Sequence, residues 1–176
     1  ASFDLKEGET IEGKLKKLEK TIFDPSFEPL VTAKTPPPGQ DILTASANNF
    51  YENVTLADLK NFKEKYPLNS KVVKQDGKVR ELVWRAGNED VKPGLYAKEL
   101  AKVIANLKLA IPYASEQQKI TLQHMIDYFE TGDPDSFRKA NISWLKDDPP
   151  VDFIIGFIEN YKDARGIKGE WEGLIS

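Results

Sequence analysis

Carboxylates near the C-terminal end are the residues in this chain best suited to chemistry. Asp152 interrupts an apolar run, residues 151–158, where a charge is costly unless it has a partner or a function. Glu159 follows that run, and Glu170 and Glu172 alternate along the next one. Two strands with such carboxylates could line a pocket that receives a cation, such as the amino terminus of a peptide. The alternative is a set of ion pairs at the edge of a sheet, with Lys162, Arg165 or Lys168.

The sequence offers almost no material for metal or nucleophilic catalysis. There is one histidine, His124, inside a predicted helix, and there is no cysteine. Zinc sites in proteins use three or four ligands, usually several His or Cys. His124 and Asp127, one turn apart, do not make such a site, and no phosphate-binding loop or nucleophile motif occurs. We therefore expect no catalytic residue, no metal site and no cofactor in this chain, and interpret His124 as structural.

Composition excludes several classes of partner. The 176 residues carry 40% hydrophobic and 30% charged residues with a net charge of −3, as in ordinary globular domains. A short lysine cluster is typical of the solvent side of a helix, so we expect no nucleic-acid partner. No apolar stretch has the length of a membrane span, and we expect no membrane partner. The absence of cysteine is compatible with any compartment; we expect a cytoplasmic protein.

The first 47 residues read as an N-terminal helix followed by a proline-rich arm. Apolar residues at helical spacing predict an amphipathic helix that Asp24-Pro25 ends: Ile11, Leu15, Leu18 and Ile22. Residues 25–40 include three consecutive prolines, which helices and inner strands exclude. We interpret this segment as an extended arm anchored by Phe27, Leu30 and Val31, with a disordered linker as the alternative.

A short helix and a hairpin come next. Thr55, with Asp58 as capping-box partner, begins a predicted helix that Tyr66-Pro67 ends. Its expected buried stripe is Leu56, Leu59, Phe62 and Tyr66. Two β-rich runs, 71–75 and 78–84, flank Asp76-Gly77, a dipeptide that strongly favours a two-residue hairpin turn.

Three helices and two strands complete the chain. Apolar residues at helical spacing predict a first helix from Tyr96 to Ile111. A second helix begins at Ser115, with Gln118 as its capping partner, and ends at Gly132. A third helix begins at Asp133-Pro134, as N-cap and first residue. The expected core residues of the last two helices are Leu122, Met125, Ile126, Phe129, Phe137, Ala140, Trp144 and Leu145. Residues 151–158 predict a strand covered on both faces, and residues 168–175 a strand that pairs back with it. The fold class is thus α+β, mostly helical with a small antiparallel β-sheet. Because an apolar run immediately precedes Ser176, we expect a truncated chain.

Four stretches resemble the dipeptidyl peptidase III family of zinc metallopeptidases, especially its bacterial branch. The order and spacing match over residues 48–176, and the last stretch is the most specific. The stretches are Asn48-Asn49-Phe50-Tyr51; Tyr66-Pro67-Leu68-Asn69-Ser70; Tyr128-Phe129-Glu130-Thr131-Gly132-Asp133; and Ile155-Gly156-Phe157-Ile158-Glu159-Asn160-Tyr161 running to Gly169-Glu170-Trp171-Glu172-Gly173.

The resemblance implies a two-lobed enzyme that binds a peptide between its lobes. One lobe carries zinc through H-E-x-x-G-H and a further Glu, and the other mixes helices with a β-core. Residues 48–176 look like the first part of the mixed lobe, because the chain contains no H-E pair. We therefore expect a fragment that is inactive alone, with zinc in the missing lobe. The expected partners are the peptide substrate and the remaining lobe of the same polypeptide.

The resemblance assigns one site residue. In the family, an acidic residue just before the Ile-Gly-Phe stretch is similar to Asp152 and helps to hold the free amino group of the substrate. Many eukaryotic members place a Tyr two residues further on, and this chain has Ile154 there. Glu159 and Asn160 receive no catalytic part. The alternatives are a non-catalytic peptide-binding or scaffold domain, an unrelated α+β interaction module, or a domain of a protein that also carries a Nudix hydrolase domain.

Overall fold

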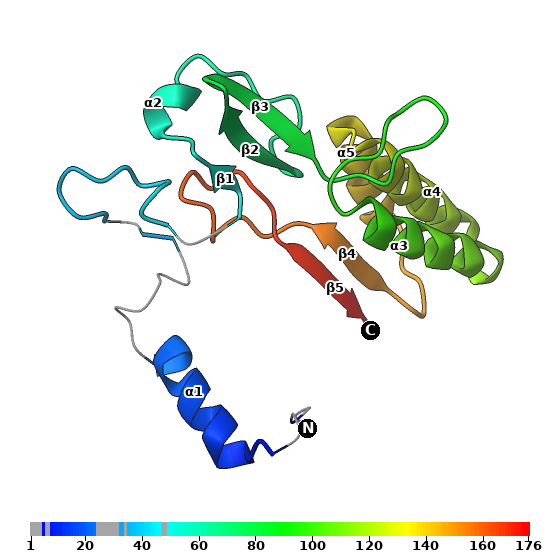
Figure 1. Ribbon diagram of the computed structural model, residues 1–176. Helices are drawn as coiled ribbons and strands as arrows, with labels where there is room; N and C mark the ends of the chain where they lie inside the picture. Colours follow the sequence, from blue (N-terminus) through cyan, green and yellow to red (C-terminus); the bar gives the residue numbers. More distant parts are fainter. Residues whose placement is uncertain (1–4, 6–7, 24–31, 34, 47–48) are drawn as a thin grey trace.

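The computed structural model describes residues 5, 8–23, 32–33, 35–46 and 49–176 (Figure 1). It confirms the α+β class. In chain order the elements are α1 Ile11–Phe23, β1 Tyr51–Glu52, α2 Leu56–Leu59, β2 Ser70–Gln75, β3 Lys78–Val83, α3 Ala97–Ala110, a 3₁₀ turn Ile111–Tyr113, α4 Glu116–Thr131, α5 Pro134–Trp144, β4 Phe153–Phe157 and β5 Trp171–Ile175.

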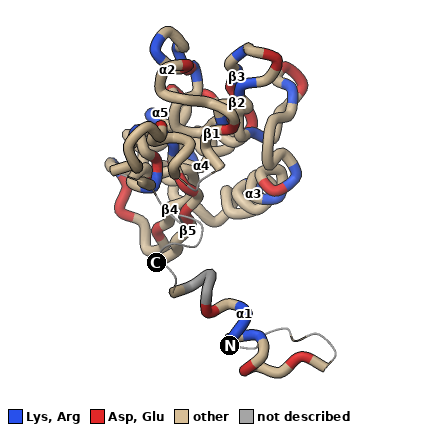
Figure 2. The backbone as a smooth tube through the Cα atoms, turned by 60° about the vertical axis from the view of Figure 1, so that its left-hand side comes forward, with Lys and Arg blue, Asp and Glu red and all other residues tan. Residues whose placement is uncertain are grey.

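The N-terminal helix α1 forms where it was predicted and stands apart from the other elements in Figure 1. Its apolar residues Ile11 and Leu15 are 49% and 50% exposed. Figure 2 shows basic and acidic residues interspersed along this helix. The side chain of Ile22 and the three proposed anchors of the arm lie outside the described residues. Further along, Leu43 is buried in a small core with Val54, Leu59 and Val72.

The helix after Thr55 is shorter than predicted. The capping box is confirmed: the Asp58 backbone N–H donates to Thr55 Oγ1 at 3.3 Å, and Asp58 Oδ2 accepts the Thr55 N–H at 2.9 Å. However, α2 ends after one turn, and Leu56 is 45% exposed. The prediction of a stripe reaching Tyr66 was wrong. The backbone leaves the helix after Leu59, and the N–H groups of Lys65 and Tyr66 donate to the Glu81 carboxylate, at 2.7 and 2.9 Å, instead of to helical carbonyls.

Asp58 also links α2 to the hairpin. Lys74 Nζ lies 2.6 Å from Asp58 Oδ1, and this bond, with the bonds from Thr55, lowers the pKa of Asp58 to about 2. A carboxyl whose pKa is depressed on folding stabilises the fold above its ordinary pKa. That contribution is lost as the pH falls from about 4 toward 2.

The predicted hairpin is confirmed. β2 and β3 pair antiparallel, and Asp76 and Gly77 at the turn have φ of 51° and 72°, the left-handed values that a type I′ turn needs. The two-residue strand β1 adds to β2 in parallel, with Tyr51 opposite Val72. The first sheet is therefore mixed, and β1 is too short to have been predicted from periodicity.

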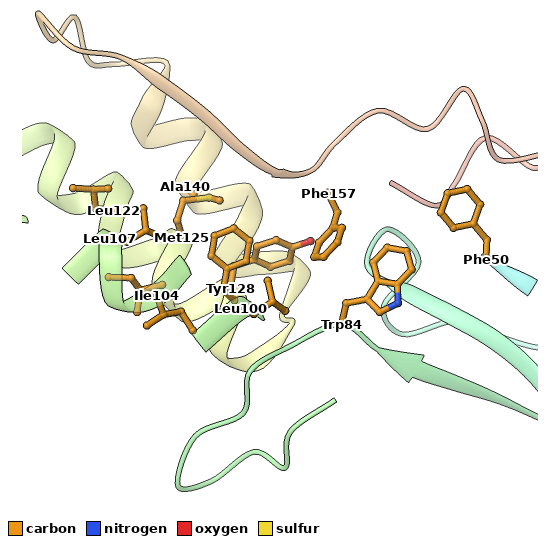
Figure 3. Close-up of a cluster of buried hydrophobic side chains, with 12 residues drawn as sticks. Phe50, Trp84, Leu100, Ile104, Leu107, Leu122, Met125, Tyr128, Ala140 and Phe157 are labelled. Atoms are coloured by element: carbon orange, nitrogen blue, oxygen red, sulfur yellow. The ribbon is translucent and has the colours of Figure 1, made fainter. Parts of the chain in front are cut away.

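The three helices α3, α4 and α5 form as predicted and build the main core. Ser115 Oγ accepts the Gln118 N–H at 3.0 Å, and Gly132 ends α4 at φ 77°. Phe129 is 1% exposed, Phe137 is partly buried against the core, and Figure 3 shows further side chains of this core. Two placements were wrong. Leu145 is 74% exposed because it lies beyond the end of α5, and Trp144 is only half-buried.

The predicted pairing of the last two strands is confirmed. β4 and β5 are antiparallel, with Phe157 opposite Trp171. The expectation that residues 151–158 are covered on both faces was wrong for Ile154, which is 39% exposed. Phe153, Ile155 and Phe157 alternate along β4 and pack against the main core, whereas Ile154 lies between them and is partly open to solvent.

A buried ion cluster holds the loop between β4 and β5 against the first sheet. Lys168 is fully buried and donates to Glu64 and, at 2.9 Å, to Ser70 Oγ. Arg165 donates to the same carboxylate. Burial lowers the pKa of Lys168, and Glu64 opposes that shift. Asp163 accepts the Lys168 backbone N–H at 2.9 Å, which ties the two ends of this turn together.

We predict that Phe129→Ala lowers the free energy of unfolding by about 3–5 kcal/mol, because it leaves a cavity in the main core. Urea unfolding followed by circular dichroism measures the change. Tyr113, 91% exposed, provides a matched aromatic control, and Tyr113→Ala should change stability by less than about 0.5 kcal/mol. Equal effects of the two substitutions would contradict this core.

We predict that Glu64→Gln destabilises the chain by about 3–5 kcal/mol, because the buried Lys168 and the partly buried Arg165 lose their shared carboxylate. The solvent-exposed Glu89→Gln is the control and should stay within about 0.5 kcal/mol. The same urea titration applies. A Glu64→Gln variant as stable as the control would show that the cluster is not formed in solution.

Candidate functional site

Asp152 is bound to the protein by neutral donors. Its Oδ1 accepts the Trp144 indole N–H at 2.8 Å and the Phe153 backbone N–H at 2.8 Å. Its own backbone exchanges two hydrogen bonds with Ser176, of 3.0 and 3.1 Å. Within the described ranges, no lysine or arginine forms an ion pair with Asp152. Two N–H donors thus compensate a half-buried carboxylate, and its second oxygen, Oδ2, takes no part in these two bonds.

The other carboxylates lie at the opposite end of the β4–β5 hairpin. Glu170 pairs with Lys162 at 2.7 Å, one of the edge ion pairs considered from the sequence. Glu159 is exposed, and its backbone carbonyl accepts the Glu170 N–H at 2.8 Å. Asp152 precedes β4 and Glu159 follows it, so the strand separates the two side chains. The structure therefore does not gather the four carboxylates into a single pocket.

An aromatic pocket of about 540 Å³ opens next to Glu170. The rings of Trp84 and Phe157 have centroids 4.7 Å apart, and Phe157 and Trp171 are 5.1 Å apart. Figure 3 shows Phe50, Trp84 and Phe157 approaching one another from separate segments of the chain. Polar groups stand around this apolar floor, namely Asn49, Tyr96, Glu99, Lys162 and Glu170. A pocket with aromatic walls and a few polar groups is the usual form of a binding site.

Tyr96 is held on the wall of this pocket in a strained conformation. It precedes α3 with a left-handed φ of 58°, which is uncommon for an aromatic residue and costs of order 1–3 kcal/mol. Its hydroxyl accepts the Asn49 side-chain N–H at 3.1 Å, and its ring meets Trp84 at 65° with centroids 6.0 Å apart. The preceding Leu95 is fixed by its N–H, which donates to the Val83 carbonyl at 2.9 Å. Strained backbone conformations that are held in place by several surrounding contacts occur most often at functional sites.

Sequence reasoning missed this pocket. Trp84 and Trp171 were assigned only to strands, and Glu99 received no role. The pocket residues come from several separate segments of the chain, so no local spacing connects them. A usable signal was the presence of large aromatic residues at the ends of strands, where a strand side chain can face a loop rather than a sheet neighbour.

A second depression is an apolar groove of about 820 Å³ between α3, α4 and the β4–β5 hairpin. Its wall includes Leu107 and Leu122 from the helices. From the hairpin it includes Leu174 and Ile175, which are 62% and 76% exposed. β5 pairs only with β4, so its other edge is open in the described structure. Exposed apolar surface of this kind marks an interaction site.

The residues present do not fit a catalytic zinc. Among the described residues, no group of three or more His, Cys, Asp and Glu could hold a metal ion. His124 Nδ1 lies 3.9 Å from Asp127 Oδ2, and both side chains are partly exposed. We also find no helix in the described ranges long and apolar enough to cross a membrane.

Comparison with known proteins adds a family. Residues 38–176 match the model of peptidase family M49. The chain is similar to dipeptidyl peptidase 3 of Dictyostelium discoideum, with 47% identity over 85 residues, which is 47% of this chain and 12% of the relative. Dipeptidyl peptidase 3 of Homo sapiens is 34% identical over 101 residues, covering 56% of this chain and 14% of the relative.

A solved structure shares the fold. Dipeptidyl-peptidase III from Corallococcus sp. strain EGB aligns with a TM-score of 0.58 and 23% identity, over 72% of this chain and 24% of that one. The chain thus spans a small part of the proteins that it resembles. Because the family model covers most of its length, the chain belongs to peptidase family M49.

Proposed function

We propose that this chain is part of a zinc-dependent dipeptidyl peptidase III-like enzyme, that it forms part of the lobe lining the substrate cleft, and that it is inactive alone. The observation that supports this most directly is the family match over residues 38–176 in a chain with a single histidine and no cysteine. When bound elsewhere in such an enzyme, zinc supplies an activated water for peptide hydrolysis. Residues of this chain would bind and position the peptide.

The exposed apolar groove supports the fragment proposal. Leu174 and Ile175 expose apolar side chains beside an unpaired strand edge, an arrangement that associates readily with further polypeptide. The curated relatives are several times longer than the chain, which covers 12% and 14% of two of them. We propose that residues 48–176 form one mixed lobe with the polypeptide that is absent here, and that the whole protein is cytoplasmic.

The peptide itself has two candidate contacts. The aromatic pocket offers apolar walls for a side chain, with Glu99 and Glu170 beside them. Asp152 offers Oδ2 at the other end of the hairpin, and it remains our proposed anchor for the amino group of the substrate. The Trp144 indole supports that proposal, because its bond to Oδ1 would orient the carboxylate. Glu159, exposed near the aromatic pocket, is the competing carboxylate.

We predict that the 176-residue chain releases no dipeptides from a test peptide, with or without added zinc. A longer polypeptide that includes this chain and a downstream H-E-x-x-G-H sequence should release them. The assay is chromatography of the products, with a Glu→Ala change in that motif as the contamination control. Activity from the 176-residue chain would refute the fragment proposal. A parent protein without the motif would instead indicate a non-catalytic scaffold.

We predict that Asp152→Asn in the longer enzyme lowers kcat/KM roughly tenfold or more, since a charge-assisted hydrogen bond is worth about 1.5–3 kcal/mol. Asparagine keeps an acceptor for the Trp144 N–H, so the melting temperature should change little. Glu159→Gln is the matched comparison. Unchanged kinetics in Asp152→Asn would reduce Asp152 to a structural acceptor, and a loss confined to Glu159→Gln would move the anchor to the other end of β4.

A further inference from the structure

The lining of the aromatic pocket includes one carboxylate that forms no ion pair within the described ranges. Its charged residues are Glu99, Lys162 and Glu170. Lys162 and Glu170 pair at 2.7 Å, and this bond raises the pKa of Lys162, so the pair stays charged at neutral pH. Glu99 is exposed on the first turn of α3. Two carboxylates and one ammonium leave the lining with one net negative charge, which attracts a cation.

A row of four rings supplies the apolar surface of this pocket. Trp84 and Phe157 are buried, at 4% and 5% exposed. Tyr96 contacts Trp84 with centroids 6.0 Å apart, and Trp171 contacts Phe157 at 5.1 Å. These two outer rings also line the pocket and are 45% and 42% exposed, so a guest can reach them. The faces of Trp and Tyr rings attract cations, and Trp does so most strongly.

The lining also distinguishes one kind of cation from another. A primary ammonium carries three N–H donors and is strongly hydrated, so it needs several acceptors when it leaves water. In the described lining, Glu99 is the carboxylate not already paired, and the Tyr96 hydroxyl accepts the Asn49 side-chain N–H at 3.1 Å. A quaternary ammonium has no N–H donor, and its methyl groups pack directly on rings. Aromatic walls with few free acceptors therefore favour the quaternary form.

We propose that the aromatic pocket binds a quaternary ammonium group, with its methyl groups against Trp171 and Tyr96 and its charge near Glu99. The pocket volume of about 540 Å³ lies within the range of small-molecule sites and leaves room for part of the molecule that carries the group. Free choline and a trimethylated lysine of a peptide both present this group. The inference does not depend on the proposed peptidase function, because every residue that it uses lies within this chain.

The three tryptophans of the chain supply both the reporter and an internal control. A chain labelled with ¹⁵N-tryptophan gives one indole N–H signal each for Trp84, Trp144 and Trp171. Choline at millimolar concentration should shift the signals of Trp84 and Trp171, which line the pocket. It should leave the signal of Trp144, which is bonded to Asp152 at the other end of the β4–β5 hairpin.

Two comparison probes separate charge from shape. 3,3-Dimethylbutan-1-ol has the shape of choline without its charge, and ethanolamine has a charge without the methyl groups. Both should bind roughly two- to fivefold more weakly than choline, the effect of one exposed cation–π contact. A peptide with a central trimethyllysine distinguishes the two sources of the group: tighter binding than choline assigns the group to a peptide, and weaker binding assigns it to a free cation.

Glu99→Gln removes the unpaired charge at an exposed position. We expect the advantage of choline over 3,3-dimethylbutan-1-ol to fall by roughly two- to fivefold in this variant. Glu89→Gln, exposed and outside the pocket lining, should leave that advantage unchanged. Equal affinities of the native chain for choline and the neutral alcohol, or an unchanged advantage in Glu99→Gln, would overturn the proposal. So would a Trp144 signal that moves as far as that of Trp171.

Discussion

The contact between Trp84 and Phe157 joins the first sheet to the β4–β5 hairpin, two parts of the fold that are distant in sequence. Trp84 follows β3, and its N–H donates to the Asn69 carbonyl before β2. Phe157 ends β4 and reaches Trp171 on β5, whose ring in turn packs 5.5 Å from Phe129 on α4. One series of rings therefore connects both sheets to the helices. Because aromatic rings bury large apolar areas, this series supplies much of the long-range packing of the chain.

Turns and helix starts were predicted well from the sequence because each depends on residues that are adjacent in the chain. The turn at Asp76-Gly77 requires two left-handed residues, and the start of α4 requires one acceptor at Ser115. The failures have distant causes. Glu81 accepts the backbone N–H groups of Lys65 and Tyr66 at the end of the predicted helix, and no spacing within residues 55–66 could reveal a carboxylate on β3. Leu145 kept the helical period although the helix had ended.

The candidate site was predictable only in part. Asp152 stood out as a charge in an apolar run, and its side chain is half-buried and accepts two hydrogen bonds. Its partner was not foreseen, because a search for lysine or arginine overlooks the indole N–H of a tryptophan. Conversely, Arg165 and Lys168 do form ion pairs, but with Glu64, more than 90 residues earlier in the chain. The residue types in the sequence show which charged side chains need a partner. Only the tertiary fold shows which residue that partner is.

Gly94 restricts which sequences can form the aromatic pocket. A Cβ at this position would lie 2.0 Å from the Val83 carbonyl oxygen, in the space that lets the two backbones pair. The same Val83 carbonyl accepts the Leu95 N–H, directly before the left-handed Tyr96. Even alanine at position 94 would therefore separate the backbone segments at Val83 and Gly94 and move Tyr96 away from Trp84. In a population of variants, we expect Gly94 to tolerate less change than the exposed residues around it, although it contributes no side chain to the pocket.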